Sequence, residues 1–243
     1  DCIFLDPARR NEHGGKTVAI SDCEPNVAEL EGLLLSKANR IMIKLSPMLD
    51  LSQALKELPH TQEVHIISVN NECKELLLLL GQTAPEEIPV HCVNLSTKGE
   101  QEKQLFVFTR EQEQHSECSY TDTLGNYLYE PNTSLLKAGA FRSIAAAYSV
   151  KKLHPNSHLY TSDTQIEGFP GRTFRIINRC SLNKKEIKEN LSDLKKANIT
   201  VRNFPATVAE LRKRIKLAEG GDTYLFASTL NDGQKILIRC GKV

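Results

Sequence analysis

Two short apolar segments, each closed by a proline, place the tightest constraint on the fold of this 243-residue chain. Residues 2–5 read Cys-Ile-Phe-Leu and run into an Asp-Pro pair, and residues 40–45 run into a Ser-Pro pair. A run of aliphatic, β-branched and aromatic residues that stops at a turn signal predicts a buried strand. Proline fixes φ and has no N–H, so it ends sheet pairing and turns the chain outward. We therefore expect two buried strands that each end in a rigid polar elbow.

Helical and strand patterns alternate through the first half of the chain. Residues 26–37 place apolar side chains at helical spacing, and a second, short helix is expected at 51–58. Residues 63–70 predict a third strand, and residues 71–80 predict a helix by their composition. The other expected elements are a loop over 11–25 with a short strand at 17–20, and a hairpin of strands at 90–95 and 104–110. This alternation predicts a parallel sheet that ends in an antiparallel hairpin at its edge.

The second half begins with a polar segment, residues 111–126, which we interpret as a linker. A short strand at 126–132, an amphipathic helix at 135–148, and a turn and strand over 151–163 follow. The remaining elements form an α/β pattern, with strands at 173–180, 199–204, 222–230 and 234–240 and helices at 182–197 and 207–217. Asn231-Asp232-Gly233 is a strong hairpin signal between the last two strands.

Composition and cysteine usage are typical of a soluble protein in a reducing compartment. Hydrophobic residues make up 40% of the chain and charged residues 25%, and no window of about 18 uncharged apolar residues could span a membrane. The seven cysteines are scattered, without a CxxC pair or a Cys/His pair at ligand spacing. This pattern predicts free thiols, a cytoplasmic location and no metal site. His154 and His158 are four residues apart, but Pro155 disfavours a helix between them.

Charge is divided unevenly between the two halves. Residues 1–118 hold 11 Lys and Arg against 19 Asp and Glu, and residues 119–243 hold 20 against 11, so the net charges are −8 and +9. The second half can therefore face a polyanion. Attraction between the two halves within the molecule is an alternative that the sequence leaves open.

The elbows define a candidate site. Ligands of open α/β sheets bind in the crevice beyond the carboxyl ends of the strands, and Asp6, Arg9 and Arg10 would project into it. A rigid elbow is suited to holding a carboxylate against a reacting group. An Asp-Pro pair taken alone is more often an ordinary turn after a core strand.

The first elbow resembles the fourth motif of class I S-adenosylmethionine-dependent methyltransferases, especially RNA-directed ones, and reads Asp6-Pro7-Ala8-Arg9-Arg10. In that family such an elbow faces the methyl donor and the target base. The order of the expected elements is similar to the second half of such a domain: fourth strand, helix, fifth strand, helix, sixth strand and seventh-strand hairpin. The helix expected at 71–80 departs from this order.

The resemblance implies a role for each residue of the elbow. Asp6 would orient or deprotonate the target base, and Pro7 would hold the loop. Arg9 and Arg10 would contact phosphate or shape the pocket. The substrate-binding residues expected at the mouths of the next two strands are Lys44, Ser46 and Glu72. Each of these could instead serve a strand end, a turn or a helix dipole.

The second half resembles two small domains of a bacterial methyltransferase family. Residues 127–137 and 154–163 are similar to its ferredoxin-like domain, and the segments 202–205, 210–214 and 220–224 are similar to its THUMP-like domain. The resemblance implies an α/β fold, with the C-terminal half of a Rossmann-like methyltransferase sheet followed by two small α/β modules. The implied domains are 1–115, 119–170 and 171–243.

The resemblance further implies S-adenosylmethionine as the cofactor and tRNA or rRNA as the partner, with methylation of a base. Basic side chains of the second half would position the RNA through its phosphates. Those expected to do so are Arg172, Arg175, Arg202, Arg212, Lys213 and Arg214. Any one of them could equally lie on a solvated helix face. Two other functions stay open: a non-catalytic RNA-binding module fused to a methyltransferase-like remnant, and a methyltransferase that acts on DNA or protein.

No Gly-x-Gly-x-Gly turn occurs in the sequence, although that turn lets the backbone approach the cofactor in nucleotide-binding sheets. We therefore expect the chain to be a fragment that begins inside the catalytic domain and is inactive without the missing part. Its opening strand would lie at an unpaired sheet edge, which favours dimerisation or aggregation.

Overall fold

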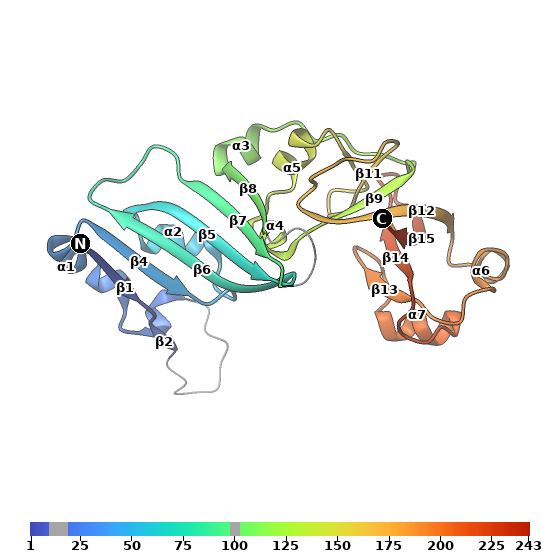
Figure 1. The fold of residues 1–243 in the computed structure, drawn as a ribbon, viewed down its shortest axis with the longest axis horizontal. Coiled ribbons are helices and arrows are strands. Elements are labelled where there is room, and N and C mark those ends of the chain that lie inside the picture. The colour runs from blue at the N-terminus through green and yellow to red at the C-terminus, as the bar shows by residue number, and fades with distance from the viewer. Residues whose placement is uncertain (10–18, 98–102) are drawn as a thin grey trace. The chain divides into compact units, whose positions relative to one another are not determined.

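Two large sheets organise the part of the chain that the structure, a computed structural model, describes: residues 1–9, 19–97 and 103–243 (Figure 1). One sheet has six strands and the other has seven, and a small two-stranded sheet pairs β2 (Ala8–Arg9) with β3 (Cys23–Glu24). The chain divides into two compact units, which are Asp1–His115 with Asn132–Ala140 and Ser116–Pro131 with Phe141–Val243. The fold is mixed α/β, as expected.

The six-stranded sheet of the first unit is mixed rather than parallel. Its strand order is β1 (Cys2–Leu5), β4 (Arg40–Leu45), β6 (Glu72–Gly81), β5 (Thr61–Val69), β7 (Pro89–Leu95) and β8 (Lys103–Thr109). β1 is parallel to β4 and β5 is parallel to β7, whereas the other neighbouring pairs are antiparallel. The expected hairpin of β7 and β8 is confirmed. The sheet is not parallel throughout because β6 lies between β4 and β5.

The prediction of a helix at 71–80 is wrong, because this segment forms strand β6. Asn70 and Asn71 have φ values of 50° and 64° and form the two-residue turn between β5 and β6. A type I′ hairpin turn needs positive φ at both central residues, and asparagine tolerates that conformation. Every second leucine of the run at 76–80 is at most 1% exposed, which is the period of a strand. The leucine-rich composition suggested a helix, but the asparagine turn and this alternation decide the structure.

Helices pack on one face of the first sheet. α1 (Val27–Lys37) and α2 (Leu51–Glu57) form where the sequence predicts them, and α4 (Thr133–Ala138) joins this unit from a later part of the chain. Side chains alternate between buried and half-buried along β4, β6 and β7. Figure 1 shows α2 behind the sheet. The described helices therefore bury one face and leave the other partly exposed.

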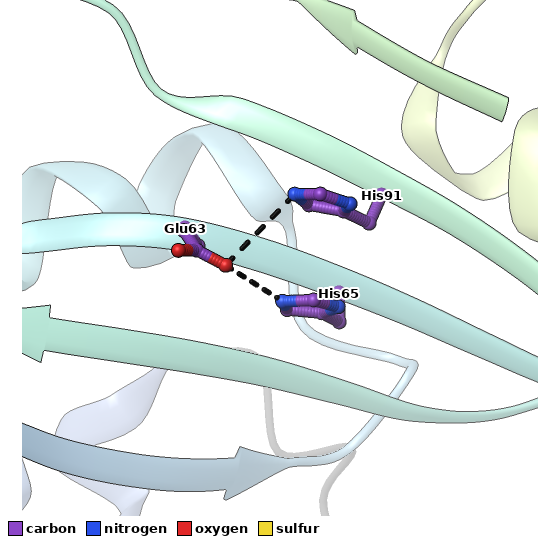
Figure 2. A group of neighbouring side chains, drawn as sticks. All are labelled: Glu63, His65 and His91. Atoms are coloured by element: carbon purple, nitrogen blue, oxygen red, sulfur yellow. Dashed lines mark hydrogen bonds and ion pairs between the residues drawn. The ribbon is translucent and has the colours of Figure 1, made fainter.

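The exposed face carries apolar side chains and a histidine pair. β1 lies at an edge of the sheet, as expected, but Phe4 is 57% exposed, so the prediction of a buried strand is wrong. His65 of β5 and His91 of β7 lie side by side on neighbouring strands, close to Glu63 (Figure 2).

The amphipathic helix expected at 135–148 is two helices. α4 and α5 (Arg142–Ala147) are separated at Gly139, which has a φ of 75°. The Thr133 N–H donates to Asn71 Oδ1 at 2.9 Å and ties α4 to the turn between β5 and β6. The chain therefore leaves the first unit at this break, and α5 belongs to the second unit.

Smaller differences from the expected elements lie near the first elbow and before the second unit. Residues 17 and 18 of the strand expected at 17–20 lie outside the described residues, and Ile20–Asp22 forms a 3₁₀ turn. The expected linker at 111–126 is helical at its start, where α3 (Arg110–His115) forms.

The seven-stranded sheet is the middle layer of the second unit. Its strand order is β10 (Lys151–Lys152), β11 (Tyr160–Ser162), β9 (Tyr127–Pro131), β12 (Gly171–Cys180), β15 (Lys235–Lys242), β14 (Thr223–Thr229) and β13 (Asn198–Val201). The strands form close to where they are expected, while α6 (Lys184–Leu191) and α7 (Val208–Ile215) are shorter than predicted. The expected turn between β14 and β15 is present, with a φ of 86° at Gly233.

Two apolar clusters flank this sheet. One includes Leu128, Leu159, Phe174 and Phe226, each at most 1% exposed. The other packs α6 and α7 against the sheet and includes Leu191 and Leu211. Since the first cluster draws side chains from both sides of residue 171, the two small modules expected from the sequence share one core.

Replacing Gly139 with alanine should destabilise the first unit by about 1 kcal/mol, because a non-glycine residue is strained at positive φ. No atom lies within 4 Å of a Cβ built at Gly139 or at Gly32, but only Gly139 has a positive φ. Gly32→Ala in the interior of α1 is therefore the matched control, and it should stabilise by about 0.5–1 kcal/mol. Urea unfolding of both variants tests this, and equal effects of the two substitutions would contradict it.

Candidate functional site

The first elbow meets the second across the parallel pair of β1 and β4. Leu5 pairs with Ile43 in the register of these strands, so Asp6 and Lys44 come next on each strand. Lys44 Nζ donates to Asp6 Oδ2 at 2.5 Å, and Glu75 Oε1 lies 4.0 Å from the same nitrogen. The hydrogen bond to Asp6 raises the pKa of Lys44. Lys44 therefore stays cationic at neutral pH and holds the carboxylate in place.

A pocket of about 210 Å³ opens between the two elbows. Its lining residues are Asp6, Pro7, Cys23, Lys44, Leu45, Ser46, Pro47 and Lys74. The side chains of Asp6 and Lys44 are 51% and 32% exposed, so a bound molecule can reach both charges. Ser46 Oγ accepts from the Met48 N–H at 3.2 Å, which shapes the second elbow as a tight turn. The arrangement offers the Asp6 carboxylate as a hydrogen-bond acceptor and the Lys44 ammonium as a cationic donor at the rim of the pocket.

The other residues predicted for this site are placed differently. Arg9 lies in β2, where its backbone pairs with Cys23, and Arg10 lies outside the described residues. Glu72 does not line the pocket. Its side chain is 73% exposed, and its Oε2 forms an ion pair with Lys74 Nζ at 2.7 Å. Lys74 and Glu75 approach the site but were missed, because a helix was expected where β6 forms.

Cys73 also lies in β6 and is half-buried. Desolvation raises the pKa of its thiol, with smaller opposing effects of Ser68 and Lys137. Because a nucleophilic cysteine needs a lowered pKa, its surroundings do not activate Cys73.

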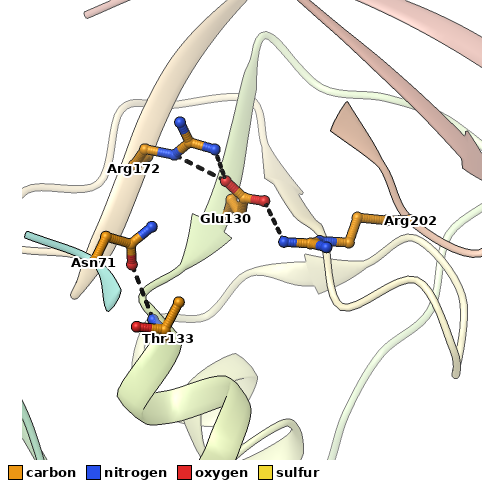
Figure 3. Close-up of polar contacts among 5 residues, drawn as sticks. All are labelled: Asn71, Glu130, Thr133, Arg172 and Arg202. Carbon is orange, nitrogen blue, oxygen red and sulfur yellow. Dashed lines mark hydrogen bonds and ion pairs between the residues drawn. The ribbon is translucent and has the colours of Figure 1, made fainter. Parts of the chain in front are cut away.

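In the second unit, Glu130 forms ion pairs with two of the predicted substrate-binding arginines, Arg172 and Arg202 (Figure 3). Glu130 is 2% exposed and lies opposite Arg172 in the register of β9 and β12. Arg172 Nε donates to Glu130 Oε2 at 2.9 Å, and Arg202 Nη2 donates to Oε1 at 3.0 Å. The arginine side chains keep exposed fractions of 40% and 37%. They therefore satisfy a buried carboxylate and still present part of each guanidinium to solvent.

The remaining predicted basic residues differ in how firmly they are held. Arg212 donates to the Ala197 carbonyl at 3.2 Å, and Arg214 donates to the Leu182 carbonyl at 2.6 Å. Lys213 and Arg175 are exposed, and neither makes an ion pair within the described part of the chain. Arg212 and Arg214 thus brace α7, whereas Lys213 and Arg175 are available to a ligand.

Three acids around α6 and α7, namely Glu186, Asp193 and Glu210, are held by local hydrogen bonds. Glu210 and Thr207 form a capping box at the start of α7, and the hydrogen bonds from Thr207 lower the pKa of Glu210. Hydrogen bonds from Ser181 lower the pKa of Glu186 in the same way, and Arg239 lowers that of Asp193. Exposed lysines of this region are left without an ion pair among the described residues, namely Lys184, Lys188, Lys195 and Lys196. This layer therefore presents positive charge outward.

Comparison with known proteins gives a likeness for each part of the chain. A family model of a ferredoxin-like domain matches residues 127–170, and a THUMP domain-like model matches residues 171–242. No curated protein matches the chain. A crystal structure from Porphyromonas gingivalis W83, named "putative methyltransferase", is 41% identical with a TM-score of 0.89. The match covers 100% of this chain and 60% of that one.

The described residues contain no helix that is both long and apolar enough to cross a membrane.

Proposed function

We propose that the protein is an S-adenosylmethionine-dependent methyltransferase that modifies a base of tRNA or rRNA in the cytoplasm, with the Asp6 pocket as its transfer site. The observation that carries the proposal is the convergence of Asp6, Pro7, Lys44 and Ser46 on one pocket beyond two parallel strands. Ligands of open α/β sheets bind at that end. The likeness of the whole chain to the P. gingivalis protein supports the same activity.

The order of elements supports a class I methyltransferase sheet. β1, α1, β4, α2 and β5 follow the order of fourth strand, helix, fifth strand, helix and sixth strand, and β6 then forms the hairpin. The helix expected at 71–80 was the departure from this order. Its replacement by a strand brings the unit closer to the class I pattern.

The described residues offer only a small pocket to S-adenosylmethionine, the methyl donor. The pocket of about 210 Å³ is smaller than the roughly 300–1,000 Å³ that encloses a typical small ligand, and the sequence has no Gly-x-Gly-x-Gly turn. In this proposal, residues outside the chain complete the donor site, in keeping with the 60% of the P. gingivalis chain that the match covers. The donor would supply the methyl group.

This chain's own residues would position the target base. Asp6 would accept a hydrogen bond or a proton from the base, and Lys44 would keep the carboxylate aligned. Pro7 and Pro47 would hold the two elbows rigid. Because methyl transfer needs alignment of nucleophile, methyl and sulfur, positioning supplies much of the rate.

The second unit would dock the RNA. Its THUMP-like match and its outward lysines and arginines support this role. Phosphate contacts of this kind set the position of a nucleic acid without reading its bases. The scattered cysteines are consistent with a reducing cytoplasm.

Tritiated methyl transfer from S-adenosylmethionine into size-separated cellular RNA tests the proposal, with the protein made as the product of its complete gene. We expect label in one RNA class and binding of that RNA by the 243-residue chain that weakens as salt rises. Omitting the donor is the blank, and DNA and total protein are assayed as competing acceptors. Label in DNA or protein instead of RNA would overturn the substrate assignment.

The second candidate function is a non-catalytic RNA-binding module. The small size of the Asp6 pocket favours it. Salt-sensitive RNA binding without any methyl transfer by the complete gene product would establish this function and reject the enzyme.

A further inference from the structure

Glu63, His65 and His91 place three potential metal ligands together on the exposed face of the first sheet (Figure 2). Their side-chain ligand atoms all lie within 4.8 Å of one another. Glu63 Oε2 is 3.2 Å from His65 Nε2 and 3.9 Å from His91 Nε2. The two rings stack with centroids 4.4 Å apart and an interplanar angle of 8°.

The sheet itself produces this cluster. Glu63 and His65 are two residues apart on β5, so their side chains share one face. His65 and His91 are Cα partners in the parallel register of β5 and β7. The positions of all three residues are therefore set by strand pairing rather than by a loop, and sites built on strands are the more precise.

We propose that Glu63, His65 and His91 bind a divalent transition-metal ion, with Zn²⁺ as the expected metal. Two imidazoles and one carboxylate are an established ligand set for zinc with an open coordination position. Ligands of a tetrahedral zinc ion with bonds of about 2.0 Å lie about 3.3 Å apart, close to the two Glu63 distances. Zinc has no geometric preference from its d electrons, and the broad χ2 well of histidine lets the stacked rings turn toward a shared ion.

The surroundings leave room for a fourth ligand. The side chains of His65, His91 and Glu63 are 27%, 25% and 45% exposed, so water or a substrate atom can reach the ion. Lys103 is near enough to act electrostatically on His91 and opposes a cation there. The Glu63 carboxylate acts more strongly on His91 than Lys103 does, and it offsets that charge. Cysteine spacing led us to expect no metal site, but spacing says nothing of histidines that meet only through strand pairing.

Calorimetric titration of the chelator-treated 243-residue chain with Zn²⁺ tests the proposal. We expect one ion per chain, and His65→Gln or His91→Gln should weaken binding at least about 100-fold, since losing even a partner that only orients a ligand costs roughly 10–100-fold. His115→Gln, an exposed histidine of α3, is the matched control and should bind Zn²⁺ as the parent does.

Exposed thiols are the competing zinc ligands, and Cys2 is exposed. Substituting Co²⁺ separates the two sites, because a thiolate ligand adds a sulfur-to-cobalt charge-transfer band and a His₂Glu site does not. Zinc should also raise the thermal unfolding temperature of the parent but not that of His91→Gln. A cooperative unfolding transition of His91→Gln would show that this variant is folded. Unchanged affinity in both histidine variants, or binding lost in Cys2→Ser, would overturn the proposal.

Discussion

Replacing Glu130 with methionine should lower the free energy of unfolding of the second unit by about 3 kcal/mol. Glu130 is 2% exposed and accepts hydrogen bonds from both Arg172 and Arg202. Removing one partner of a buried, hydrogen-bonded ion pair costs roughly 3–5 kcal/mol, because the remaining charge is left uncompensated. The low end applies here, since both arginine side chains keep more than a third of their surface exposed and water can solvate them.

A triple variant separates the cost of breaking this cluster from its net contribution. Replacing Glu130, Arg172 and Arg202 together with methionine leaves no unpaired charge, so most of the lost stability should return. The chain has no tryptophan, so urea unfolding is followed by far-ultraviolet circular dichroism. A triple variant less stable than Glu130→Met would show that the cluster is strongly stabilising in itself.

The same variants decide between two roles for the arginines. If Arg172 and Arg202 also contact RNA, the folded triple variant should lose RNA affinity and show a smaller dependence of binding on salt. Unchanged RNA binding by the triple variant would restrict both arginines to holding Glu130. Lys213→Gln is the comparison, because that lysine is exposed and makes no ion pair among the described residues.

Local signals predicted most of the elements, and failures arose where tertiary pairing decides. The proline elbows were sufficient to predict strands β1 and β4, and the Asp-Gly turn was sufficient to predict the hairpin of β14 and β15. The composition of the leucine run in β6 suggested a helix, because composition does not show that β4 and β5 pair with this segment on either side. Gly139 divided the helix expected at 135–148, and a glycine with positive φ is the usual helix end.

The candidate site was predictable only as far as neighbouring strands could be paired. Asp6 and Lys44 follow adjacent residues of two parallel strands, so a sheet with β1 beside β4 brings them together. Glu75 approaches Lys44 only because β6 lies against β4, which the expected helix excluded. The histidine pair needs the register of β5 and β7. Spacing along the chain therefore predicts which residues of one strand share a face. Predicting which residues meet across strands requires the sheet topology.

Replacing Asp6 with asparagine should lower kcat for methyl transfer by about 100-fold or more in the complete gene product. A positioned acid or base contributes roughly 10²–10⁴-fold to the rate. Asparagine keeps the size of Asp6 but can neither act as a base nor form an ion pair with Lys44. Glu117→Gln removes the same charge from an exposed position outside the pocket and should leave kcat unchanged.

Lys44→Met extends the test, because it leaves the carboxylate but removes the group that holds it. We expect a smaller loss of kcat than in Asp6→Asn, since a mobile carboxylate can still reach the base. RNA binding should be retained in both variants if the second unit docks the RNA, so the loss would appear in kcat and not in affinity. Full activity of Asp6→Asn would remove the elbow carboxylate from the mechanism and leave only the rigid prolines and the shape of the pocket to position the base.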